Sequence, residues 1–213
     1  NLIAGEILYA PTLSENVPAD WDTSNNECTY LWNAKAGSQT ITAEDGGIHY
    51  KTSGKADIIL FPALRAENYV YSAKFTAKGL KGSFGLAVEC QSGSGKTFFI
   101  YPNDPDEMGI QYAGAGSAKY YKGIRKAIEV GTTVTMTAYH LNGESHFFID
   151  GVYVASLADK EATAGKIGLY NCGGDALVTD ISVKALEEID TTYTPKFTNV
   201  REEVSLGKML YGI

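Results

Sequence analysis

The sequence of 213 residues is poor in arginine and lacks long apolar runs. Its three arginines are Arg65, Arg125 and Arg201, and acidic residues outnumber basic ones by 25 to 18, which gives a formal net charge of −7. Proteins bind duplex nucleic acid through clustered Lys and Arg, so we expect no nucleic-acid partner. No apolar run reaches the ~18 residues that a membrane-spanning helix needs, so we expect no membrane span.

Cysteine is also scarce, with Cys28, Cys90 and Cys172 far apart in the chain. No C-x-x-C pair is present, and the three histidines are not spaced to complete a zinc site. At most one disulfide can form, and the alternative is that all three are small buried apolar residues. Tyrosine is in excess, with 14 Tyr against 8 Phe and 2 Trp. Its apolar ring and polar hydroxyl suit partly solvent-exposed surfaces and interfaces.

Alternating polar and apolar residues recur along the chain between short Gly, Asn and Asp turns, which indicates an all-β protein. The segment 132–157 predicts three antiparallel strands, because Asn142-Gly143 and Asp150-Gly151 are sequences of type I′ turns. We expect the first turn to pair Tyr139 with His146. The second turn is expected to pair Phe147 with Val154.

Further strands bring the total to roughly a dozen, the number typical of a two-sheet sandwich or barrel. The strands are expected at 39–44, 48–52, 56–61, 69–77, 83–91, 97–101, 109–113, 119–122, 166–171 and 177–185. On 83–91, Cys90 is expected on the core face and Glu89 on the opposite face.

The segment 144–183 resembles the closing strands of concanavalin A-like jelly rolls, especially bacterial laminin-G-like and 3-keto-glycoside-hydrolase-like members. The family pattern "F-x-V-D-G-V-x-V-A" corresponds to Phe147–Ala155, "G-x-I-G-L" to Gly165–Tyr170 and the last strand to Ala176–Val183. The resemblance covers about residues 55–185. It implies two packed antiparallel sheets, one concave and one convex, with sugars lying across the concave sheet.

The catalytic branch of this superfamily carries E-x-D-x-x-E on one strand, and that triplet does not occur in this sequence. A glycosidase needs two carboxylates across a cleft, and Glu89 alone stands mid-strand on a face expected to lie away from the core. A lone carboxylate of this kind is expected to be a binding or structural group rather than half of a catalytic pair. CQSGSGKT (90–97) ends like a phosphate loop, but its first glycine is missing and a strand follows, so we expect a hairpin loop.

The aromatic and amide residues of the central strands are the best positive feature for ligand binding. Sugars stack their C–H face on aromatic rings, and their hydroxyls bind carboxylate, amide and ammonium groups. The residues expected to face away from the core are Glu89, Gln91, Thr97, Phe99, Tyr101, Gln111, Lys119 and Tyr121. Tyr139 and Tyr153 are expected on the convex side, outside the ligand site. The alternative for this tyrosine-rich face is that Tyr simply tolerates partly exposed strands.

Two oxygen-rich loops are candidates for calcium, which takes six to eight oxygen ligands. The first holds Asn103, Asp104 and Asp106, and the second set is Asn171, Asp175 and Asp180. The alternative is that both are solvated turns. No other cofactor is expected.

The sequence thus predicts an all-β, two-sheet antiparallel jelly-roll sandwich over 1–186 and a C-terminal tail or linker over 187–213. The tail either packs back on the sandwich or leads to a further domain to which the protein is tethered. We expect a non-catalytic, lectin-like carbohydrate-binding module of a secreted or cell-surface bacterial protein, with a glycan or polysaccharide as partner. The alternatives are a glycoside hydrolase of the 3-keto-glycoside type and a ligand-free structural spacer.

Overall fold

The computed structural model describes residues 2–13, 15–24, 39–54, 56–64, 67–91, 94–103, 108–112, 118–121, 128–158 and 165–188. Within this part of the chain there are fourteen β-strands and no helix, which confirms the all-β prediction. Accordingly, the described residues include no helix long and apolar enough to cross a membrane.

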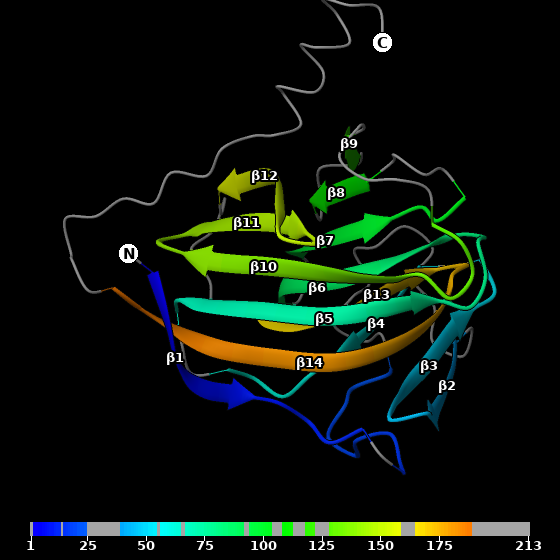
Figure 1. Ribbon diagram of the computed structural model, residues 1–213. Helices are drawn as coiled ribbons and strands as arrows, with labels where there is room; N and C mark the ends of the chain where they lie inside the picture. The colour runs from blue at the N-terminus through cyan, green and yellow to red at the C-terminus, as the bar shows by residue number, and fades with distance from the viewer. Residues whose placement is uncertain are drawn as a thin grey trace, which may run out of the picture.

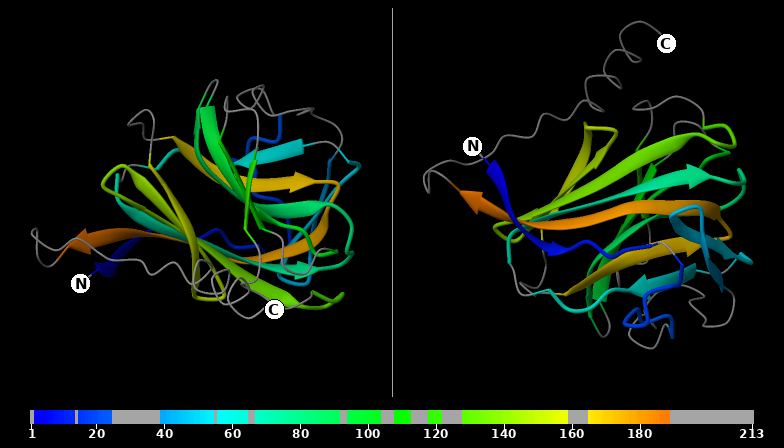
Figure 2. Two further views of the ribbon diagram at one scale, coloured as in Figure 1. Left: turned by 90° about the horizontal axis from the view of Figure 1, so that it is seen from above. Right: turned by 60° about the horizontal axis from the view of Figure 1, so that its bottom comes forward.

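The strands form two antiparallel sheets stacked as two layers (Figure 1, Figure 2). The larger sheet has eight strands, in the order β12 (Val152–Ala158), β11 (Glu144–Ile149), β10 (Thr133–Leu141), β5 (Tyr69–Ala77), β14 (Asp175–Glu188), β3 (Gly47–Thr52) and β2 (Gln39–Glu44), with β1 (Leu2–Tyr9) also paired to β14. The smaller has six strands, in the order β4 (Ala56–Leu60), β13 (Lys166–Cys172), β6 (Ser83–Gln91), β7 (Ser94–Ile100), β8 (Met108–Tyr112) and β9 (Ala118–Tyr121). The two-sheet jelly-roll prediction is confirmed. Strand β1 was not predicted.

The main hydrophobic core lies between the two sheets and is rich in aromatic rings. Phe98 of the six-stranded sheet packs on Phe147 of the eight-stranded sheet, with ring centroids 5.1 Å apart. Phe75 and Phe84 also meet across the two sheets, in a stacked arrangement with ring centroids 5.6 Å apart. Burying a large side chain stabilises the fold by about 1.5–3 kcal/mol, so these contacts hold the sheets together.

The two predicted hairpins of the meander are present. Asn142 and Asp150 have φ of 50° and 48°, as type I′ turns require, and Tyr139 pairs with His146 as predicted. The predicted pairing of Phe147 with Val154 is wrong, because a bulge makes Val154 an extra residue and Phe147 pairs with Ala155.

Strand β6 contains another bulge, between Val88 and Gln91, and Glu89 at this bulge has φ of 55°. An extra residue in one strand reverses the inward and outward alternation beyond it. Beyond the bulge, Gln91 pairs with Ser94 of β7, which confirms the predicted hairpin in place of a phosphate loop.

Candidate functional site

The outer face of the six-stranded sheet, opposite the main core, carries a second apolar cluster. Along each central strand, alternate residues belong to the two clusters: Phe98 lies in the main core and Phe99 in the outer cluster, and Leu169 and Tyr170 divide in the same way. The outer cluster contains Ala56, Ile58, Leu60, Ala87, Cys90, Phe99 and Tyr170, with Tyr101 and Cys172 packed against it. Both faces of this sheet are therefore apolar.

Three aromatic rings form a continuous row on this outer face. The ring of Phe99 lies 5.5 Å from Tyr101 in an edge-to-face arrangement and 5.1 Å from Tyr170. Phe99 and Tyr170 are buried, whereas Tyr101 is half-buried. Burial raises the pKa of the Tyr170 hydroxyl well above its usual range, so it remains a neutral donor. We call Phe99, Tyr101 and Tyr170 the aromatic row.

Thr97 lies next to the aromatic row on the same face of β7. Its strand neighbours are Ala87 on β6 and Gln111 on β8. The side chain is 1% exposed, and its hydroxyl has no hydrogen-bond partner among the described residues. The outer face therefore combines aromatic rings with one unpaired polar atom.

The structure places Glu89 inside the sandwich, so the prediction that it lies on the face away from the core is wrong. The bulge turns its carboxylate towards the eight-stranded sheet, where Oε1 accepts a hydrogen bond of 2.8 Å from the Ser145 hydroxyl. Lys96 Nζ lies 2.5 Å from Oε2, and His140 Nε2 lies 2.8 Å from Oε1. Cys90, predicted in the core, lies in the outer cluster instead.

His140 bridges this buried carboxylate to the backbone. Its Nδ1 lies 2.5 Å from the carbonyl oxygen of Glu67, and its ring stacks on Tyr69 with centroids 5.1 Å apart. Both ring nitrogens of His140 therefore face oxygens, and sequence spacing offers no signal for this arrangement.

Three predicted ligand residues keep their strand positions, but two of them fall in a different row. Gln111 pairs with Thr97, which places it in register with the outer-face row. Lys119 pairs with Ile110, and Tyr121 pairs with Met108. Ile110 in turn pairs with Phe98, and Met108 pairs with Ile100, and both of these partners belong to the main core. The prediction that Lys119 and Tyr121 lie on the same face as Gln111 is therefore wrong. The side chains of Gln91, Gln111, Lys119 and Tyr121 lie outside the described part.

The calcium prediction is only partly covered by the described residues. Asn103 is exposed in a turn after β7, and Asp104 and Asp106 lie outside the described residues. Within the described chain, no group of three or more His, Cys, Asp or Glu side chains is arranged to hold a metal ion. The first loop stays a prediction.

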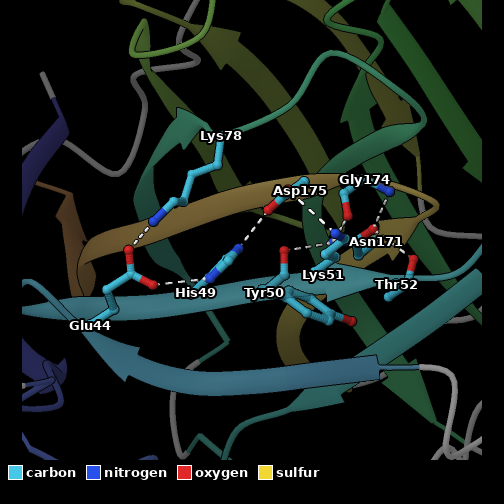
Figure 3. Close-up of polar contacts among 9 residues, drawn as sticks. All are labelled: Glu44, His49, Tyr50, Lys51, Thr52, Lys78, Asn171, Gly174 and Asp175. Atoms are coloured by element: carbon cyan, nitrogen blue, oxygen red, sulfur yellow. Dashed lines mark hydrogen bonds and ion pairs between the residues drawn. The ribbon is translucent and has the colours of Figure 1, made fainter.

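The residues of the second oxygen set have separate partners. Asn171 is buried and binds Thr52, Tyr50 and Gly174 through its side chain (Figure 3). Its Oδ1 accepts from the Thr52 hydroxyl and the Gly174 amide, and its Nδ2 donates to the Tyr50 and Gly174 carbonyl oxygens. This amide links β13, β3 and the turn before β14.

Asp175 takes part in a neighbouring network that is partly exposed and that sequence reasoning did not predict. His49 lies between two carboxylates, with Nδ1 3.0 Å from Glu44 Oε2 and Nε2 2.6 Å from Asp175 Oδ1 (Figure 3). Lys78 binds the same Glu44 carboxylate. Asp180 instead pairs with Lys74 at 3.2 Å. These contacts connect β2, β3, β14 and the end of β5, and we assign them a structural role.

No family model matches the chain. No curated protein matches it either. Several solved structures are similar in fold. The carbohydrate binding module CBM66 from Bacillus subtilis is 16% identical, with a TM-score of 0.60, and the match covers 82% of this chain and 100% of that chain.

Two further structures are similar at lower identity. A protein of unknown function with a galectin-like fold from Bacillus subtilis is 13% identical over 87% of this chain and 99% of that chain, with a TM-score of 0.66. The catalytic domain of an endo-1,3-beta-glucanase (laminarinase) from Thermotoga petrophila RKU-1 is 10% identical over 88% of this chain and 100% of that chain, with a TM-score of 0.54. At such identities the likeness shows the fold alone, a two-sheet jelly-roll sandwich of the kind that the sequence resemblance implied. This fold carries binding modules and enzymes alike, so function has to be argued from the site.

Proposed function

We propose that this domain binds carbohydrate on the outer face of the six-stranded sheet. The observation that carries the proposal is the aromatic row, in which Phe99 contacts both Tyr101 and Tyr170 on the face opposite the core. A sugar ring presents an apolar C–H face, which packs well on aromatic side chains, and its hydroxyls find partners in nearby polar atoms.

The fold supports the same proposal. The carbohydrate binding module CBM66 aligns with this chain over the whole of its own length. A binding module needs only a shaped, partly aromatic surface, whereas hydrolysis of a glycosidic bond needs two carboxylates at a defined separation. Glu89, the mid-strand carboxylate that the sequence offered, is bound by Lys96, His140 and Ser145 between the sheets. Its contacts favour a structural role, and the proposed function is binding without catalysis.

We place the domain in a secreted or cell-surface bacterial protein, where it would bring a glycan to a tethered partner domain. The function itself is tested by calorimetric titration of the folded protein with cello-, malto-, galacto-, manno- and fructo-oligosaccharides. We expect at least one of these to bind, and we expect Tyr101→Ala to weaken that binding about five- to fifty-fold, since ring contacts contribute about 0.5–1.5 kcal/mol beyond the buried area.

The matched control is Tyr153→Ala. Tyr153 is also a half-buried tyrosine, but it lies on the outer face of the eight-stranded sheet, where its ring contacts Phe148. Its removal should leave the affinity within about two-fold. Equal losses from both variants, or no binding by a folded sample across the whole panel, would contradict the proposal.

A further inference from the structure

The hydroxyl of Thr97 is the one buried side-chain oxygen or nitrogen without a hydrogen-bond partner in the part of the chain that the structure describes. Thr97 is 1% exposed and lies on β7 between Lys96 and Phe98, both of which face the interior. A buried hydroxyl that has lost water and gained no partner destabilises the folded state. Such a group calls for a physical explanation.

Other buried hydroxyls of the same fold are paired, so Thr97 is an exception. The Thr52 hydroxyl donates to Asn171 Oδ1 at 2.9 Å, and it also accepts from the Gly173 amide at 2.6 Å. Ser145 donates to Glu89, and Tyr71 donates to the carbonyl oxygen of Gly168 at 2.6 Å. The sandwich thus provides partners for hydroxyls that face its interior. The unpaired one belongs to Thr97, which the register of β7 places on the outer face, two residues before Phe99.

The position of Thr97 on β7 aligns it with the aromatic row. Residues two apart on a strand share a face and lie about 7 Å apart, so Thr97 and Phe99 follow one another along one side of β7. Tyr101 comes directly after the strand, and its ring contacts Phe99. The cross-strand neighbour on β6 is Ala87, an apolar residue of the outer cluster whose side chain offers the hydroxyl no hydrogen-bond partner. A saccharide lying along β7 would place an apolar ring face on Phe99 and Tyr101. One of its hydroxyl groups would then be next to Thr97 Oγ1.

The charge of the outer face decides the class of saccharide. The side chains of the outer cluster are all uncharged. Lys166 pairs with Cys90 of the outer cluster, at the end of β13. Carboxylate or sulfate groups on a glycan would need Arg or Lys partners along the strands, and the net charge of −7 opposes them further.

We propose that Thr97 Oγ1 is the hydrogen-bonding anchor for one hydroxyl of an uncharged saccharide, an inference that rests on the proposed carbohydrate-binding function. Tyr101, the half-buried member of the aromatic row, is contacted first. Thr97 and Phe99 are 1% and 2% exposed, so the saccharide reaches them only by displacing the atoms that cover them. The bound sugar then supplies the partner that the hydroxyl lacks.

The test is Thr97→Val, which removes the hydroxyl and keeps the shape of the side chain. We expect two opposite effects. The Tm of the free protein rises by about 2–4 °C, because an unpaired buried polar atom is removed. The affinity for the neutral oligosaccharide that the wild type binds falls about three- to thirty-fold, because the anchoring hydrogen bond is lost.

Two variants serve as controls. Thr97→Ser keeps a hydroxyl at the same position and should hold the affinity closer to that of the wild type than to that of Thr97→Val. Thr52→Val removes a hydroxyl that is buried and fully paired between the sheets. It should lower the Tm and leave the affinity unchanged.

The outcomes separate this inference from the proposed function. If Tyr101→Ala weakens binding and Thr97→Val does not, the anchor is overturned while the carbohydrate site stands. If Thr97→Val lowers the Tm of the free protein, the hydroxyl is paired before the sugar arrives, and the anchor is again overturned. If oligogalacturonate binds more tightly than every neutral oligosaccharide, the uncharged class is wrong. If the folded wild type binds none of these sugars, the proposed function fails, and the anchor fails with it.

Discussion

The ammonium nitrogen of Lys96 lies 2.5 Å from Oε2 of Glu89, in the space between the two sheets. The Lys96 side chain is 0% exposed and that of Glu89 is 8% exposed, so both charges are withdrawn from water. The carboxylate also contacts Ser145 and His140 of the eight-stranded sheet. Glu89, which was predicted from the sequence to be a sugar ligand, thus connects the two sheets through contacts in the interior.

Removing one member of this pair should destabilise the fold strongly. Lys96→Met leaves a buried carboxylate without its closest cation, and breaking a buried pair in this way costs about 3–5 kcal/mol. The double variant Glu89→Gln/Lys96→Met should recover most of the loss, because neither charge is then left alone. Chemical denaturation measures both. The control is Lys74→Met, whose partner Asp180 is 68% exposed and whose loss should cost under about 1 kcal/mol. A similar, small effect of both Lys variants would refute the account of the buried pair.

His146 should make the protein sensitive to mild acid. Burial, followed by the nearby charges of His140 and Lys96, lowers the pKa of His146 to about 4 in the folded state. Ser156 contacts its Nδ1, and Glu144 lies 3.7 Å from its Nε2. Because the unfolded pKa is about 6.5, the unfolded state takes up the proton first. The stabilising contribution is therefore complete above pH 6.5 and is lost as the pH falls towards 4.

The variant His146→Gln isolates this effect. Partial exposure screens the charges, so we expect the contribution lost between pH 6.5 and pH 4 to be about 1–2 kcal/mol. The free energy of unfolding of the variant should fall less over this range than that of the wild type. Parallel pH profiles of the two proteins would mean that His146 does not titrate differently in the folded state.

Asn171 should be among the most sensitive polar residues of the fold. It is 0% exposed and bonds to Thr52, Tyr50 and Gly174. Asn171→Ala leaves these groups buried without partners, and we expect a loss of about 2–4 kcal/mol in denaturant titrations. Asn103→Ala, at an exposed turn, should stay within about 0.5 kcal/mol of the wild type. An equally small change at Asn171 would mean that water replaces the lost bonds.

The calcium prediction for Asn103, Asp104 and Asp106 can be tested with the same samples. A bound ion stabilises the folded state in proportion to the logarithm of its concentration over its dissociation constant. If the loop holds calcium, millimolar Ca²⁺ raises the Tm, EDTA reverses the rise, and Asp104→Asn/Asp106→Asn removes it. A Tm unchanged by both additions would mean that the loop binds no calcium.

The turns explain why much of the fold was predictable. Asn142-Gly143 and Asp150-Gly151 have the backbone that their sequences demand, and each hairpin sets the register of the strands that follow. The alternation of Tyr69–Ala77 likewise matches its burial in the structure. These are local signals, and they suffice for strand positions and for the two-sheet class.

The bulges explain why the site was predicted less well. An alternating pattern cannot reveal where one strand carries an extra residue, so Glu89 and Cys90 were assigned to each other's faces. Lys96 was placed in a loop, although β7 begins at Ser94 and directs Lys96 inward. No bulge separates Phe99 and Tyr101 from the interior residues that precede them, so the alternation holds and their predicted face is correct.

The most direct test of the central claim is a titration of ¹⁵N-labelled protein with a neutral oligosaccharide, followed by amide chemical shifts. We predict that the largest changes occur at Thr97, Phe99, Tyr101 and Tyr170, on the outer face of the six-stranded sheet. Amides of Tyr139, Phe148 and Tyr153, on the eight-stranded sheet, should remain unchanged. Shifts confined to the eight-stranded sheet, or no shifts at millimolar sugar, would contradict the account.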